Sequence, residues 1–102
     1  MIEYVDLADY LSIAERVLQV DAKVLARGAG IGLADSALAS PQAAFGGQEF
    51  YPEFERKAAV LLLHLVQNHP LPDGNKRTAY ATFREFIARN AQTWVASHLK
   101  AD

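Results

Sequence analysis

The chain has 102 residues, 51% hydrophobic and 22% charged, which are ordinary globular proportions and exclude a disordered or fibrous protein. A formal net charge of −2 gives no case for direct nucleic-acid binding, and the absence of cysteine excludes disulfides, thiolate metal sites and a cysteine nucleophile. No apolar run approaches the roughly 18–20 residues of a membrane span and the N-terminus lacks a signal-peptide pattern, so we expect a single cytoplasmic domain over residues 1–102.

The first periodic segment predicts a helix over about residues 6–26. Asp6 suits the N-cap, and Asp9 stands in the capping-box position three residues later. A break near residues 20–21 stays open because valines dilute the helix propensity there, and Gly28 suits the C-cap. Apolar residues recur at spacings of three and four along this segment: Leu7, Leu11, Ala14, Leu18, Ala22 and Leu25.

The next segment is rich in glycine and predicts loops, with one or two helical turns at residues 35–40, capped by Asp35, before Pro41 interrupts. Residues 42–51 are typical of two short extended arms around a turn at residues 46–47, which indicates a β-hairpin. Ordinary loop packing and a partner-binding surface are equally good accounts of its aromatic side chains, Phe45, Phe50 and Tyr51.

Two further helices are predicted, over residues 52–68 and 75–90. Pro52 suits the first helical position, and residues 58–63 are apolar on almost all faces, which indicates a central helix. Residues 93–96 are expected to form a short strand or a last turn. The sequence therefore predicts an all-α fold with a small β-hairpin, and the third helix is expected to bury Ala79, Phe83, Phe86 and Ile87.

The loop between these two helices, residues 69–78, carries the residues suited to chemistry. Two prolines and a glycine within five residues forbid a continuous helix and predict a tight loop. Asn75 caps the next helix or begins its first turn, where backbone N–H groups have no helical partner. Lys76 and Arg77 lie at this positive end of the helix dipole, which is unfavourable for cations unless an anion binds there. The pattern predicts a phosphate-binding pocket.

Two other residues of the loop add reactive groups to this pocket. His69 accepts a proton near neutral pH, and Asp73 is a hard oxygen ligand suited to a Mg²⁺ ion carried by nucleotide phosphates. A general base, a metal ligand and a cationic cradle are the parts that phosphoryl or nucleotidyl transfer requires. A protein hydroxyl is the expected acceptor, deprotonated by His69 as it attacks.

Residues 69–77, His-Pro-Leu-Pro-Asp-Gly-Asn-Lys-Arg, resemble the signature of the Fic/Doc superfamily, which reads His-x-Phe-x-(Asp/Glu/Asn)-(Gly/Ala)-Asn-(Gly/Lys)-Arg. Leu71 replaces the usual Phe, and we expect it to keep the anchoring role. Lys76 stands where AMP-transferring Fic enzymes carry Gly, and here the chain is similar to the Doc (death-on-curing) toxins. The resemblance extends upstream through residues 32–42 and then 45–47.

The resemblance implies the toxin of a toxin–antitoxin system, a kinase that transfers the γ-phosphate of ATP to a threonine of elongation factor Tu and so stops translation. It implies His69 as the base, Asp73 as the Mg²⁺-associated acid, and residues 42–51 as a flap that docks the target by strand addition. A Fic-type AMP transferase and a catalytically silent Doc-like binding domain are the alternatives. The residues that the resemblance assigns to phosphate binding are Gly74, Asn75, Lys76 and Arg77.

Two further expectations concern control of the activity. The chain has no Ser/Thr-x-x-x-Glu-(Gly/Asn) inhibitory signature, so restraint is expected from a separate antitoxin. The usual family chain continues into further C-terminal helices, and this chain is expected to be a short or truncated member. An amphipathic antitoxin helix is then expected to cover apolar residues of the tail, Trp94, Val95 and Leu99.

Overall fold

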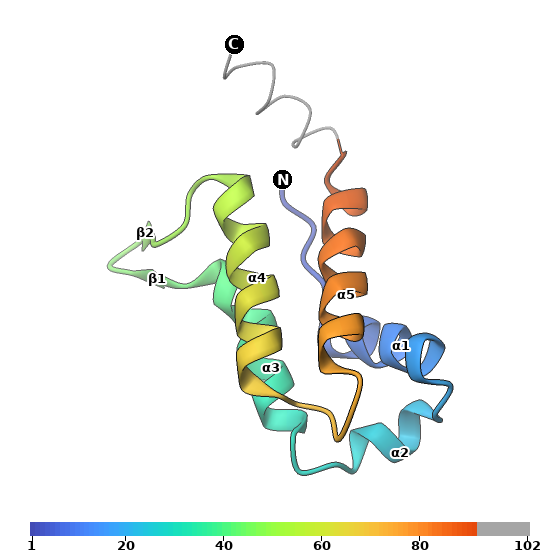
Figure 1. Ribbon diagram of the computed structural model, residues 1–102. Coiled ribbons are helices and arrows are strands. Elements are labelled where there is room, and N and C mark those ends of the chain that lie inside the picture. The colour runs from blue at the N-terminus through green and yellow to red at the C-terminus, as the bar shows by residue number, and fades with distance from the viewer. Residues whose placement is uncertain (92–102) are drawn as a thin grey trace.

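The computed structural model describes residues 1–91, which form a mainly helical bundle with one small hairpin (Figure 1). The hairpin pairs β1 (Ala44–Phe45) with β2 (Gln48–Glu49) in antiparallel register. This confirms the expected all-α fold with a β-hairpin. Within this range no helix combines the length and apolar character of a membrane span. The α-helices described are α1 (Leu7–Leu18), α2 (Ala22–Ala26), α3 (Ile31–Ala39), α4 (Phe54–Asn68) and α5 (Asn75–Arg89), with a 3-10 turn, η1 (Ser40–Gln42), after α3.

The first predicted helix is divided in two, at the place where a break was left open. The capping box is confirmed, because Asp6 and Asp9 each accept a hydrogen bond from the other's backbone N–H at the start of α1. Helix α1 ends at Leu18, and its C-cap, Gln19, has a left-handed backbone (φ 57°). The Asp21 side chain then caps α2. A continuous helix over residues 6–26 is therefore wrong.

Helix α3 begins earlier than the sequence indicated. Asp35 lies inside the helix, and Gly30 occupies the N-cap position, so the predicted cap at Asp35 is wrong. The reason is tertiary packing. One face of α3, formed by Ala34, Ala37 and Leu38, is buried, and α3 packs on α4, which outweighs the low helix propensity of the preceding glycines.

Helices α4 and α5 run antiparallel beside each other, with the loop of residues 69–74 between them (Figure 1). Helix α3 packs on α4 and α1 packs on α5, so α4 is central as predicted, although it begins at Phe54 rather than at Pro52. Ala79 and Phe86 are buried, whereas Phe83 and Ile87 are half-buried. The expected short strand or turn at residues 93–96, and the tail residues Trp94, Val95 and Leu99, lie outside the described residues.

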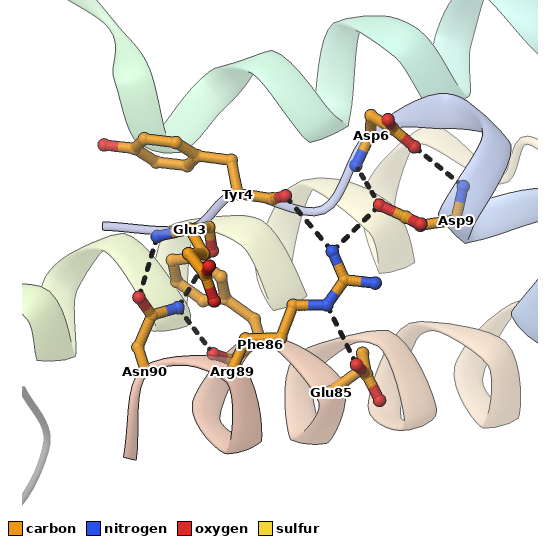
Figure 2. Close-up of polar contacts among 8 residues, drawn as sticks. All are labelled: Glu3, Tyr4, Asp6, Asp9, Glu85, Phe86, Arg89 and Asn90. Atoms are coloured by element: carbon orange, nitrogen blue, oxygen red, sulfur yellow. Dashed lines mark hydrogen bonds and ion pairs between the residues drawn. The ribbon is translucent and has the colours of Figure 1, made fainter. Parts of the chain in front are cut away.

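The N-terminal segment is tied to the end of α5 by a polar network (Figure 2). The Asn90 side chain accepts from Glu3 N–H (2.8 Å) and donates to Glu3 carbonyl O (2.9 Å). The Arg89 guanidinium donates to the carboxylates of Asp9 and Glu85, each at 2.9 Å. The Glu85–Arg89 ion pair joins residues four apart on α5, and the ion pair of Arg89 with Asp9 fastens α1 to α5 as well.

This network predicts an acid-sensitive part of the stability. The hydrogen bond from Arg89, helped by the Asp6 backbone N–H, lowers the pKa of Asp9 from 3.8 to about 2. Because the folded-state pKa lies below the unfolded one, ionised Asp9 stabilises the fold above about pH 4, and this is lost as the pH falls through about 2. Asp9→Asn should lower the unfolding free energy at pH 7 by about 1 kcal/mol in urea titrations. The difference should shrink towards pH 2.5; an equal difference at both pH values would contradict this origin.

Candidate active site

The loop that follows α4 begins with a residue in a costly backbone conformation. His69 ends α4 in the left-handed region (φ 47°, ψ 56°), where an L-residue costs about 1–2 kcal/mol and where Gly or Asn is usual. Its side chain is exposed rather than used for packing. The fold therefore keeps an imidazole at a position where glycine would be cheaper, which indicates a function for the ring.

The loop is closed on itself by Leu71 and Asn75. The Asn75 side chain accepts from Leu71 N–H (2.9 Å) and donates to Leu71 carbonyl O (2.8 Å), so both backbone groups of Leu71 are satisfied. The Leu71 side chain is buried in the core, which confirms its expected anchoring role. Gly74 is the N-cap of α5 and Asn75 is its first residue. Because the Asn75 side chain bonds to both backbone groups of Leu71, it fixes the shape of the loop.

Two glycines allow the loop to approach the neighbouring helices. A Cβ on Gly30, at the start of α3, would lie 1.8 Å from the carbonyl O of Pro70. A Cβ on Gly74, whose φ of 72° is left-handed, would lie 2.2 Å from Leu18 at the end of α1. Asn68 also donates to the carbonyl O of Leu33 on α3 (3.1 Å). The ends of α1, α3 and α4 therefore meet at this loop because side chains are absent at two positions.

Gly30→Ala is therefore expected to distort the loop. The atoms in the way are the backbone C, O and Cα of Pro70, which cannot swing aside, so we expect a loss of about 2–3 kcal/mol in urea unfolding. Gly32→Ala is the matched control, because no atom lies within 4 Å of its Cβ position and the residue is inside α3. The control should gain roughly 0.5–1 kcal/mol. Equal effects of the two changes would rule out the close approach as the cause.

A cavity of about 590 Å³ lies beside the loop, a volume typical of small-molecule sites. One wall is the loop itself, and the structure brings His69, Asp73 and Arg77 together on it. Gly74, Asn75 and Lys76 are not part of the lining. The opposite wall, which sequence reasoning missed, is largely apolar and comes from the ends of α1 and α2, the glycine-rich turn and α3: Leu18, Val20, Val24, Leu25, Gly28, Ala29, Gly30 and Leu33.

The first turn of α5, which reaches the cavity at Arg77, offers donors for an anion. Within the described residues, the backbone N–H groups of Asn75, Lys76 and Arg77 in the first turn of α5 have no hydrogen-bond acceptor. The N-terminal end of a helix carries a partial positive charge, and the Arg77 guanidinium adds a full one at the cavity. This arrangement suits a phosphate group.

The residues present fit a Mg²⁺ ion only as part of a metal–nucleotide complex. Among residues 1–91 no group of three or more His, Asp or Glu side chains is arranged to hold a metal ion. The cavity has one carboxylate in its lining, Asp73, which is exposed. Mg²⁺ is usually bound by one or two carboxylates together with substrate phosphates, and Asp73 meets that requirement.

Comparison with known proteins supplies an independent result. A model of the Fic/DOC family matches residues 4–87, a range that includes the whole loop and both walls of the cavity. Toxin Doc of Mycolicibacterium smegmatis is 42% identical over 90 residues, which are 88% of this chain and 66% of the relative's length. The chain thus spans slightly less than two thirds of that relative. No solved structure matches the chain.

Proposed function

The chain belongs to the Fic/Doc family, and from that premise we propose that it is a Doc-like toxin that transfers the γ-phosphate of ATP to a Ser/Thr hydroxyl of elongation factor Tu. The cavity that gathers His69, Asp73 and Arg77 on one wall is the observation that carries the proposal. It provides a base, a Mg²⁺ ligand and a phosphate clamp within one space large enough for a nucleotide.

In the proposed reaction, the His69 imidazole removes the proton of the target hydroxyl as its oxygen attacks the γ-phosphorus. The bond between the γ-phosphorus and the β–γ bridging oxygen breaks, and ADP leaves. Arg77 and the free N–H groups at the start of α5 stabilise charge on the phosphate oxygens. Asp73 would hold Mg²⁺, which when bound neutralises part of the phosphate charge.

Control of this activity is proposed to come from a partner protein. The relative that is 42% identical is named a toxin, and a kinase that modifies a translation factor would be lethal if left free. We therefore propose a cognate antitoxin that binds the chain stoichiometrically. Co-expression with the product of the neighbouring gene should restore growth, and absence of any complex between the two would contradict this.

Position-specific labelling of ATP tests the reaction. The purified chain is incubated with elongation factor Tu and ATP labelled on either the α- or the γ-phosphate. Label on the target from the γ-position alone is expected for the kinase. Label from the α-position alone would exclude the kinase and support AMP transfer by the same cavity.

Expression in cells separates an enzyme from a catalytically silent binding domain. Growth arrest that requires His69 is expected for the enzyme, so His69→Ala should restore growth at equal protein level. Arrest that persists in this variant would show that binding alone is responsible.

A further inference from the structure

The hairpin of β1 and β2 packs little against the hydrophobic core. Every residue from Ala44 to Phe50 is exposed, and each strand has only two residues. Its turn, Gly46-Gly47, has positive φ at both positions (61° and 81°), as a type I′ turn requires. An isolated two-stranded hairpin is only marginally stable in water. The direction of the β1–β2 hairpin therefore depends on the contacts made at its base.

One atom, Nζ of Lys57, contacts both sides of that base. It donates to Glu49 Oε1 on β2 at 2.6 Å and to the carbonyl O of Pro41, just before β1, at 3.3 Å. The Tyr4 ring lies 6.0 Å from the same ammonium group. The outgoing and returning segments of the hairpin are therefore fastened to a single point in the first turn of α4.

Lys57 is a charged residue whose side chain is buried, which is rare for lysine. Its side chain is 3% exposed, whereas that of Glu49 is 49% exposed. Burial acts to lower the pKa of Lys57, and the hydrogen bond to Glu49 together with Tyr4 reverses this, so the net pKa is raised and the group stays charged. Replacing a whole buried ion pair by well-packed apolar residues is often neutral in stability, so the core does not require this pair in order to be filled. An ammonium group, unlike an apolar one, imposes directed bonds on its neighbours.

We propose that Lys57 is a positioning residue that sets the direction of the hairpin and so presents its exposed edge to the protein target. The identity of the protein target in this proposal rests on the proposed function. Twelve residues separate Lys57 from His69, which is about 18 Å along α4. A target held by the hairpin at one end of α4 must reach His69 at the other, so a change in the hairpin's direction would move the acceptor hydroxyl away from the cavity.

Hydrogen exchange tests the positioning without any enzymatic activity. The Phe50 N–H donates to the Ala43 carbonyl O (2.9 Å) across the hairpin base and serves as the probe. Lys57→Met and Glu49→Gln should each speed exchange of this amide roughly tenfold, with amides of α4 and α5 unchanged. The double variant should exchange no faster than Lys57→Met alone, because both changes remove the same contact. Wild-type exchange in both single variants would overturn the proposal, and so would additive effects in the double variant.

The matched control is Arg56→Met, at the adjacent helix position. Arg56 forms an exposed ion pair with Glu53 at 4.0 Å, which is worth little, so exchange at Phe50 should not change. If Lys57→Met does not fold, Glu49→Gln decides the question, because Glu49 is half exposed and its removal leaves the core intact.

The kinetic part uses elongation factor Tu and γ-labelled ATP. Glu49→Gln should raise the KM for the protein target roughly tenfold while the KM for ATP stays at the wild-type value. Equal changes in both KM values would show a general structural effect and overturn the positioning role. If the wild-type chain transfers no phosphate to this target, the proposed function fails, and the exchange measurements alone decide the role of Lys57.

Discussion

His69→Ala should lower the rate of phosphoryl transfer roughly 10²–10⁴-fold, while ATP binds with nearly wild-type affinity. The imidazole is exposed on the cavity wall, and no ion pair or hydrogen bond of its side chain is found among the described residues. Its removal therefore takes away the base without removing a phosphate contact. Single-turnover rates with γ-labelled ATP, and calorimetric titration with a non-hydrolysable ATP analogue, measure the two quantities separately.

His69→Asn is the variant that separates chemistry from backbone strain. Asn tolerates the left-handed backbone of this position better than other L-residues, so the fold should be at least as stable as the wild type. Its amide cannot act as a base at neutral pH, and the loss of rate should match that of His69→Ala. A rate close to wild type in His69→Asn would show that the residue only shapes the loop.

The sequence predicted the parts of the fold that depend on local signals. The capping box of Asp6 and Asp9, the hairpin around Gly46-Gly47 and the start of α5 at Asn75 are confirmed. Each depends on residues within a few positions of one another, where backbone geometry and capping decide the outcome. The start of α3 was missed because burial against α4 decides it, and a local pattern contains no information about that contact.

In the candidate site, too, the part that depends on local sequence was predicted and the part that depends on tertiary contacts was not. The loop residues His69, Asp73 and Arg77 were predicted to act together, and the structure places all three on one cavity wall. The apolar wall is formed where separate helix ends meet, which requires Gly30 to lie against Pro70, and spacing in the sequence does not report such a contact. The cluster of glycines before α3 was the available signal.

The spacing of Lys57 in the sequence was a signal for the hairpin contact that the sequence analysis did not use. It stands four and eight residues before Leu61 and Leu65, on the buried face of α4. A lysine in phase with a buried stripe is a charged group that must find a partner inside the protein. That partner, Glu49, is on the hairpin, so the pattern of one helix contained a clue to how the hairpin is held.

Arg77→Ala should lower kcat/KM roughly 100-fold, through a higher KM for ATP and a lower kcat together, because a phosphate clamp acts in both the ground and transition states. Lys76→Ala is the matched control: the two residues share their charge, exposure and helix turn, but only Arg77 lines the cavity. A change of less than about threefold is expected for the control, because an exposed charge that does not line the cavity contributes little.

The comparison of the Arg77 and Lys76 variants also tests the roles assigned to the loop. The family resemblance assigns both side chains to phosphate binding. The cavity lining favours Arg77, because a planar guanidinium can bind two phosphate oxygens at once. Arg77→Lys keeps the charge and loses that fork, so its kcat/KM should lie between those of the wild type and Arg77→Ala. Equal losses in the Lys76 and Arg77 variants would assign the effect to net charge at the start of α5. An equal loss of ATP affinity in the Arg77→Ala and His69→Ala variants would show that the clamp and the base have been misassigned.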